Sequence, residues 1–263
     1  MCLSEFKHIL SGSMNMTDIA MNIARDARAL GVCAGDLLLV HSSFKSLRAP
    51  EATPADVIDG LIYALDGGTL VMPTLSYEHC GPDSPVFDAR NTPSNVGAIH
   101  EYFRTHYPVR RSLCPTHSCA ALGPMADELT RDHQLDDTPC GAHSPLRRLA
   151  EMGGRILFLG CSTDRNTSMH AIEEIAEPDY LFAGGAEYEL TDMEGNVHRM
   201  NCRAHGFKGV TQRYGRVVQV MPPEAVHKGN ILAADCTLLD ARPMWRTALE
   251  YYSRDAHYFV DVE

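Results

Sequence analysis

A strand–helix–strand pattern in the first third of the chain constrains the fold most. Residues 37–41 and 69–72 are apolar runs of strand length. Between them, Thr53 and Pro54 are typical of a helix N-cap and first position, and a glycine pair ends that helix before the second strand. Two strands joined by a helix at this spacing predict a parallel βαβ unit with a right-handed crossover.

The rest of the chain extends this pattern. Further helices are expected at residues 17–30, after Ser94, and at 124–131, 145–152 and 240–255, and further strands at 119–122, 155–160 and 217–220. Two short runs that flank Glu194-Gly195-Asn196 predict a hairpin. The predicted fold class is therefore a three-layer α/β/α sandwich, with a central sheet that is largely parallel or mixed and with β-rich insertions in the C-terminal third.

We expect one domain. It would cover residues 17–263, with a β-rich insertion on the substrate side at about 185–232 and a flexible N-terminal extension at 1–16. An apolar fraction of 44% and a charged fraction of 22% are ordinary for a soluble globular chain. No apolar run approaches the ~18 residues of a membrane span, and the first residues do not resemble a signal peptide. A cytoplasmic location is the resulting expectation.

Charge and cysteine usage narrow the choice of partners. The net charge is −11 and no polybasic run exists, so neither a nucleic acid nor a membrane is an expected partner. The nine cysteines are scattered without any C-x-x-C pair, as in a reducing compartment.

The common sequence motifs do not name the function. Motifs for a P-loop, a dinucleotide site, a His-Glu-x-x-His metal site and a nucleophile elbow are all absent, and no metal is expected.

Polar clusters follow the predicted strands, where open α/β sheets bind ligands. They are His41-Ser42-Ser43, Pro73-Thr74, Arg111-Ser112 with Thr116-His117-Ser118, and the stretch 161–173. In the last cluster Thr167 is expected to cap a helix, which places His170 in its first turn and Glu173 on the same face. An imidazole with a reference pKa of ~6.5 suits general-base catalysis. The helix N-terminus favours the neutral form of the imidazole, whereas the carboxylate of Glu173 favours its cation. The sequence leaves open which of the two effects is stronger.

Several of these motifs together resemble a known family. Residues 39–44, 68–74 and 111–118 occur in the order found in the antibiotic N-acetyltransferase family, which contains the aminoglycoside 3-N-acetyltransferases. The most specific stretch is Asp164-x-Asn166-Thr167-Ser168-x-His170-x-x-Glu173. The resemblance covers about residues 17–180 and, more loosely, 232–259.

The resemblance implies an acetyl-CoA-dependent transfer to an amino group of an aminoglycoside (the 3-amino group) or a related amino sugar, without a covalent enzyme intermediate. His170 would be the general base, and Glu173 would orient it or hold the substrate ammonium, together with Asp164 and Asn166 as substrate-binding residues. By the same resemblance, the pantetheine and phosphates of the coenzyme would be bound by His41, Ser42, Ser43, Thr74, Arg111, Ser112 and Ser118. A homodimer is left open.

Two features depart from the family pattern. Cys114 stands where many relatives have histidine. The stretch 199–208 contains no carboxylate, so Arg199, Arg203 and Lys208 would repel a polycationic antibiotic unless acidic residues between 187 and 194 compensate. The alternative is the same chemistry on a less basic, non-antibiotic biosynthetic amine.

Three other hypotheses remain. A Cys114–His117 pair would support a thiol acyltransferase that works through a thioester. His117, Cys161, Asp164 and His170 would support a metal-dependent hydrolase, although their spacing matches no standard zinc site. A coenzyme-binding protein without turnover would keep the fold but have no need for His170 and Glu173.

Overall fold

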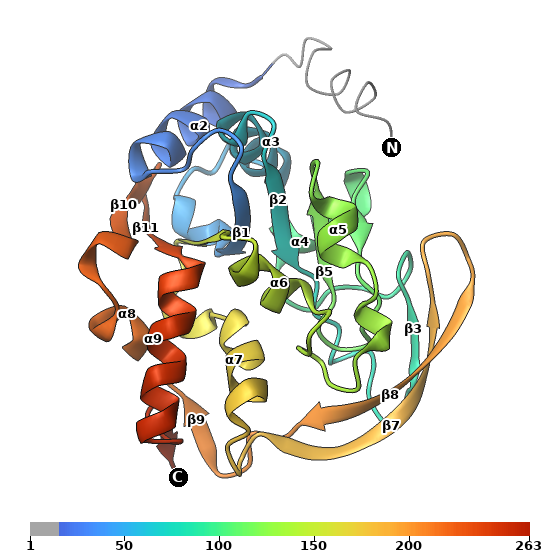
Figure 1. Ribbon diagram of the computed structural model, residues 1–263. Helices are drawn as coiled ribbons and strands as arrows, with labels where there is room; N and C mark the ends of the chain where they lie inside the picture. The colour runs from blue at the N-terminus through green and yellow to red at the C-terminus, as the bar shows by residue number, and fades with distance from the viewer. Residues whose placement is uncertain (1–15) are drawn as a thin grey trace.

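A seven-stranded mixed sheet forms the centre of the molecule in the computed structural model, which describes residues 16–263 (Figure 1). The expected N-terminal extension lies, apart from Met16, outside the described residues. The strand order is β10-β11-β6-β1-β2-β5-β4. These strands are β1 (Leu37–Ser42), β2 (Thr69–Pro73), β4 (Arg110–Arg111), β5 (Cys119–Leu122), β6 (Arg155–Leu159), β10 (Val226–Ile231) and β11 (Ala234–Asp240).

The middle of this sheet is parallel and its flanks are antiparallel. β1 pairs in parallel with both β2 and β6, which confirms the predicted βαβ unit. β5 runs antiparallel to β2, and β11 runs antiparallel to β6. Because β6, β1 and β2 point the same way, the segments that follow them meet at one edge of the sheet.

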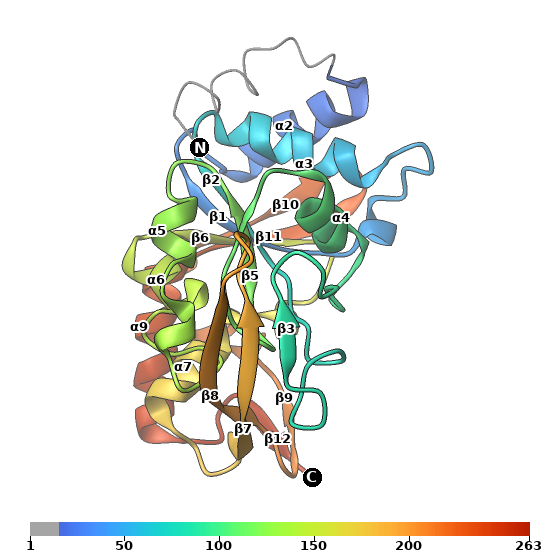
Figure 2. The same cartoon turned by 90° about the vertical axis from the view of Figure 1, so that its right-hand side faces the viewer.

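Helices cover both faces, and the predicted three-layer fold is confirmed (Figure 2). One layer contains α2 (Asp18–Leu30), α3 (Pro54–Leu65) and α4 (Ala98–His106); the other contains α5 (Ala126–Thr130), α6 (Pro145–Glu151), α7 (Ser168–Ala176), α8 (Arg216–Val220) and α9 (Ala241–Arg254). Leu38 and Val40 of β1 face the first layer, whereas Leu37 and Leu39 face the second. The alternation of strand side chains thus fills two cores from one sheet.

Local sequence signals account for most of the helix boundaries. Thr17 accepts a hydrogen bond from the Ala20 amide at 3.1 Å, and Thr53 forms a capping box with Asp56. Two expectations were wrong. The helix expected after Ser94 begins only at Ala98, and residues 217–220 form α8 instead of a strand. A helical turn places the apolar side chains of α8 and of the next residue on one side, where they enter the core.

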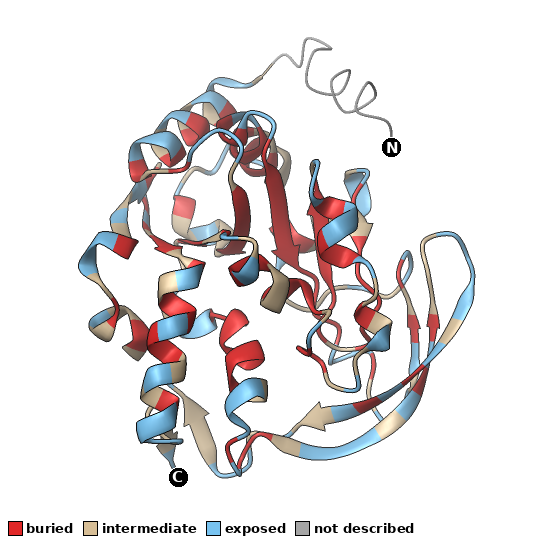
Figure 3. Cartoon of the chain, in the orientation of Figure 1, coloured by how far each residue is buried: buried red, intermediate tan, exposed pale blue. Residues whose placement is uncertain are grey.

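Two small sheets lie outside the central one, below it in the view of Figure 1. β3 (Val86–Asp88), β7 (Phe182–Thr191) and β8 (Val197–His205) form the first, and β9 (Val210–Gln212) and β12 (Val260–Val262) form the second. The antiparallel β7–β8 pair confirms the expected hairpin. Short 3₁₀ helices lie at Phe44–Leu47, His133–Leu135, Thr163–Arg165 and Pro223–Ala225. Figure 3 shows the central strands buried, whereas much of the β7–β8 hairpin is exposed.

No helix within residues 16–263 has both the length and the apolar character that crossing a bilayer requires.

Candidate active site

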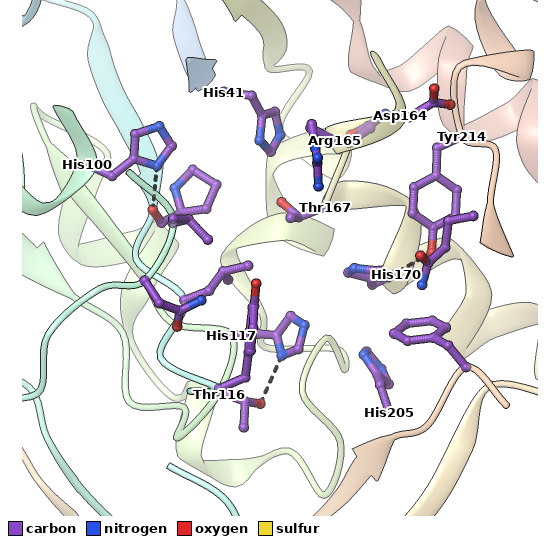
Figure 4. Close-up of a pocket in the computed structure, with 18 of the residues that line it drawn as sticks. His41, His100, Thr116, His117, Asp164, Arg165, Thr167, His170, His205 and Tyr214 are labelled. Carbon is purple, nitrogen blue, oxygen red and sulfur yellow. Dashed lines mark hydrogen bonds between the residues drawn. The ribbon is translucent and has the colours of Figure 1, made fainter. Parts of the chain in front are cut away.

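A cavity of about 990 Å³ opens at the edge of the sheet where the parallel strands end (Figure 4). One wall, the sheet-side wall, consists of the C-terminal ends of β1 and β2 and of the residues that follow β1, β2 and β6. The opposite wall, the hairpin-side wall, consists of the end of β8 and the turn after it. Of the residues predicted from sequence, those that line the cavity are His41, Ser42, Ser43, Asp164, Asn166 and His170.

His170 lies between the two walls, in the first turn of α7 as predicted. Its Nδ1 is 3.1 Å from Oε2 of Glu173 and 3.0 Å from the hydroxyl of Tyr214. Nε2 has no hydrogen-bond partner among residues 16–263. A proton on Nδ1 donated to Glu173 leaves a lone pair on Nε2, which is the tautomer that a general base requires.

Glu173 is completely buried behind His170 and does not line the cavity. Its Oε1 accepts hydrogen bonds from Tyr180 at 3.0 Å and Tyr252 at 3.2 Å, and its Oε2 accepts one from Tyr214 at 2.7 Å. Burial, followed by the nearby carboxylate, raises the pKa of all three phenols, so they remain donors. This geometry supports the orienting role of Glu173 and not contact with a substrate ammonium.

The three tyrosines were missed by sequence reasoning. Tyr180 follows α7, Tyr214 precedes α8 and Tyr252 lies in α9. No local motif joins positions so far apart along the chain. The packing of α7 against α9 brings Tyr252 to the carboxylate, and the segments after α7 and before α8 bring Tyr180 and Tyr214.

The end of β1 and the residue after it form part of the sheet-side wall. The His41 ring stacks on Phe158 with ring centres 5.1 Å apart, and its Nε2 is buried without a partner among the described residues. Burial lowers the pKa of His41 to about 3, so the ring is neutral. Ser42 is 3.1 Å from Nε2 of His100, and Ser43 accepts a hydrogen bond from Ser46 at 2.9 Å. These polar atoms are available to a ligand in the cavity.

Arg111, Thr74, Ser112 and Ser118 lie behind this wall and do not line the cavity. Arg111 donates to the hydroxyls of Thr74 at 3.2 Å and Ser118 at 3.0 Å, and to the carbonyl of Thr92 at 2.6 Å. Burial lowers its pKa to about 9, which still leaves the guanidinium charged at neutral pH. The polar groups of these four residues are used within the protein, and their contact with the coenzyme stays a prediction.

The remaining predicted residues lie just before α7. Asp164 is exposed at the cavity, and its Oδ1 accepts from the Gly215 amide at 2.8 Å. Asn166 is buried, and its Oδ1 accepts from the hydroxyl of Ser168 at 2.6 Å. Thr167 occupies the N-cap position, as predicted, but makes no capping bond. Its hydroxyl is instead buried without a partner within the described chain, in a residue that lines the cavity.

The hairpin-side wall contributes groups that sequence reasoning did not single out as site residues. His205 at the end of β8 and Phe207 line the cavity opposite His170, with ring centres 5.3 Å and 5.1 Å from that of His170. The ring centre of His117 is 5.4 Å from that of His170 and 5.0 Å from that of His205. The stretch 199–208 lacks carboxylates, but the fold brings Glu174 to His205 at 2.7 Å.

The geometry does not favour the thiol or the metal hypothesis. Cys114 is fully buried outside the cavity lining, and burial raises its pKa to about 12. Within the part of the chain that the structure describes, no group of three or more His, Cys, Asp or Glu side chains is arranged to hold a metal ion.

Comparison with known proteins agrees with the geometry. The model of the family described as aminoglycoside 3-N-acetyltransferase matches residues 39–253. Aminoglycoside N(3)-acetyltransferase IV from Salmonella is 40% identical over 235 residues, 88% of this chain and 86% of the relative. Aminoglycoside N(3)-acetyltransferase VIII from Streptomyces fradiae is 32% identical over 237 residues, 81% of this chain and 78% of the relative.

Solved structures agree as well. A variant of aminoglycoside acetyltransferase AAC(3)-IVa in complex with a gentamicin superposes with a TM-score of 0.76 at 29% identity, over 90% of this chain and 89% of the other. The fold, the motifs around His170 and these matches lead to the same assignment. The chain belongs to the aminoglycoside 3-N-acetyltransferase family of enzymes.

Proposed function

We propose that this enzyme transfers the acetyl group of acetyl-CoA to the 3-amino group of an aminoglycoside, with His170 as general base. The family match and the gentamicin complex of a relative support the substrate class. The observation that carries the mechanism is the free Nε2 of a histidine held by a buried carboxylate at the wall of a large cavity. Resistance to such antibiotics would follow from this activity.

The transfer needs no covalent enzyme intermediate. The neutral amine attacks the thioester carbonyl carbon, and the C–N bond forms as the C=O π electrons move to oxygen. Nε2 of His170 takes a proton from the attacking nitrogen, and Glu173 stabilises the imidazolium that results. The C=O bond re-forms as the C–S bond breaks, and the leaving thiolate takes the proton from the His170 imidazolium, which restores the base. The unpartnered hydroxyl of Thr167 is a suitable donor for the oxyanion.

The two walls divide the ligands between them. His41, Ser42 and Ser43 on the sheet-side wall contact the coenzyme arm, where parallel strands end and backbone N–H groups suit phosphates. The acceptor lies toward the hairpin-side wall. Glu173 orients His170 from behind, and Asp164 at the cavity is available to a cationic amino group.

The alternative acceptor, a less basic biosynthetic amine, rests on the cations of β8. Arg203 lines the cavity and lies over the ring of Phe182 at 3.6 Å. Arg199 is neutralised by Glu187 at 2.7 Å and does not line the cavity. Arg203, with Arg165 elsewhere on the cavity lining, disfavours, but does not prevent, the binding of a polycation with several other contacts.

The experiment is an assay of free-thiol release from acetyl-CoA against gentamicin, sisomicin, glucosamine and simple primary amines. The proposal predicts turnover with the antibiotics and far slower turnover with the amino sugar. Turnover restricted to simple amines or amino sugars would favour the alternative, and mass spectrometry of the product would identify the acetylated nitrogen.

A further inference from the structure

Two consecutive glutamates of α7 each hold a different histidine. Glu173 holds His170, as described above. Glu174 bonds through Oε1 to Nε2 of His205 on β8 at 2.7 Å, and both side chains of this second pair are only 3% exposed. A buried carboxylate–imidazole pair is costly to maintain, because both groups leave water. The reaction described above does not use it.

The second pair faces the same cavity as the first. His205 lines the cavity, and its Nδ1 is buried without a hydrogen-bond partner among the described residues. The ring centres of His170 and His205 are 5.3 Å apart (Figure 4). Because both residues line the cavity and lie this close together, one bound ligand can contact both rings.

The environment of the pair favours a proton on the carboxyl over a proton on the ring. Glu174 also accepts hydrogen bonds from the hydroxyl of Thr138 and, at 2.8 Å, from the amide of Cys140. Burial raises the pKa of Glu174 to about 7, and it lowers the pKa of His205 to about 3. With Nε2–H donated to Glu174, Nδ1 carries a lone pair without a partner among the described residues and is the ring atom left to accept a proton.

The proton balance of the reaction leaves one proton for which a second acceptor is needed. An amine that arrives as its ammonium loses two protons before it becomes an amide nitrogen. One of these protons ends on the coenzyme sulfur. His170 accepts a proton from the attacking nitrogen, but a single imidazole cannot hold both protons at once.

We propose that the His205–Glu174 pair is a second proton acceptor, which deprotonates the incoming ammonium so that His170 receives a neutral amine. This inference rests on the proposed acetyl transfer. The ammonium N–H bond breaks and its electron pair stays on nitrogen. The proton binds Nδ1 of His205, and the proton on Nε2 moves to Oε1 of Glu174. The pair gains one proton in total, and that proton returns to water by the reverse path after the product leaves.

The other titratable and charged groups around the pair define the background of any pH profile. They are His170 and Glu173 of α7, His117 of the loop before β5, Asp136 after the 3₁₀ helix at His133–Leu135, Arg203 of β8, and the cysteines Cys114, Cys140 and Cys202. Burial raises the pKa of these three thiols, so they stay neutral in the working range.

Glu174→Gln provides the test, with the full chain, acetyl-CoA and gentamicin. The control is Glu177→Gln, which removes an exposed carboxylate at the end of the same helix. The variant without Glu174 must rely on amine that is already neutral. Above pH 7, where the wild-type pair is free to accept a proton, we therefore expect kcat/KM of this variant for gentamicin to fall by about tenfold for each pH unit below the pKa of the acceptor amine. Above that pKa it should return to within a few-fold of the wild-type value, and the control should follow the wild type throughout.

His205→Gln separates proton transfer from folding. The glutamine amide N–H can replace Nε2–H toward Glu174, but glutamine has no acceptor in the place of Nδ1. It should show the same pH-dependent loss, with unchanged coenzyme affinity by calorimetry. A loss that is equal at every pH, or full activity in both variants, would overturn the inference. Wild-type enzyme that releases no thiol with any aminoglycoside would instead refute the proposed function.

Discussion

The two walls of the cavity are built in different ways. The sheet-side wall consists of short contiguous segments that follow parallel strands, and a buried network around Arg111 holds it from behind. The hairpin-side wall places His205 and Phe207 opposite His170 from an otherwise largely exposed hairpin. The first wall is therefore a rigid edge suited to a constant ligand such as the coenzyme. On the function proposed above, the second wall, a surface addition, would adapt the site to its acceptor.

The largest effect is expected at the residue between the walls. His170→Ala removes the proposed base and should lower kcat by roughly 10² to 10⁴. Coenzyme affinity should be unchanged, because the sheet-side wall remains intact. Thiol release and calorimetric titration with CoA measure the two quantities on the same preparation, and equal activity in the variant would refute the assignment of the base.

Substitution of Arg111 tests whether the residues behind the sheet-side wall have a structural role. Arg111→Met leaves the carbonyls of Ala89, Thr92 and Thr74 without this donor and should cost about 3 kcal/mol in the free energy of unfolding. The control Arg199→Met, on the exposed hairpin, should cost less than about 1 kcal/mol. Denaturant titration measures both. Weaker CoA binding without any loss of stability would instead favour the direct contact expected from sequence.

Buried histidines that line the cavity should make the fold sensitive to acid. Burial lowers the pKa of His100 to about 4 from the ordinary 6.5. Between these values the unfolded chain binds a proton that the folded chain does not, so stability falls as the pH drops from about 6.5 toward 4. This one residue should cost about 2 kcal/mol between pH 6.5 and pH 5.

His100→Gln should remove that part of the pH dependence of the unfolding free energy, whatever its effect at neutral pH. The exposed His79→Gln should leave the pH dependence as it is in the wild type. A slope that is the same in all three proteins would contradict the buried neutral state of His100.

Glu173→Gln should weaken the orientation of His170 without removing the base. We expect a loss of about tenfold in kcat, greatest at low pH where the carboxylate would stabilise the charged ring. Tyr252→Phe, which removes one hydrogen bond from the other carboxylate oxygen, is the matched control for a disturbed network and should have a smaller effect. If the two variants lose the same activity at all pH values, Glu173 has a structural role only.

The smallest effect is expected on the sheet-side wall itself. Ser43→Ala removes one hydroxyl from the cavity and should raise KM for acetyl-CoA a few-fold with little change in kcat. KM for the acceptor should stay the same. A change confined to the acceptor would reverse the assignment of ligands to the two walls.

The difference between the two walls also explains which parts of the site could be predicted from the sequence. The strands 37–41, 69–72 and 155–160 and the polar residues after them carry local signals, so the sheet edge, His41 and His170 could be placed in advance. Local signals do not say whether a polar residue faces the cavity or lies behind it, so the position of Arg111 and its partners behind the wall could not be predicted.

Contacts between distant segments could not be predicted. The tyrosines around Glu173 and the bond from Glu174 to His205 depend on how α7, α9 and the hairpin pack together. The β10–β11 hairpin at the edge of the central sheet was also missed, because neither strand shows a strong apolar pattern. Residues 217–220 illustrate the reverse case, where a valine-rich run predicts a strand and tertiary packing makes it a helix.

The most direct measurement is a crystal structure of the enzyme with CoA and gentamicin bound together. Nε2 of His170 should lie within hydrogen-bonding distance of the 3-amino nitrogen, with the coenzyme sulfur on the side of Ser43 and the antibiotic on the side of His205. A thiol far from the imidazole, or an antibiotic bound outside the space between the two walls, would contradict the account.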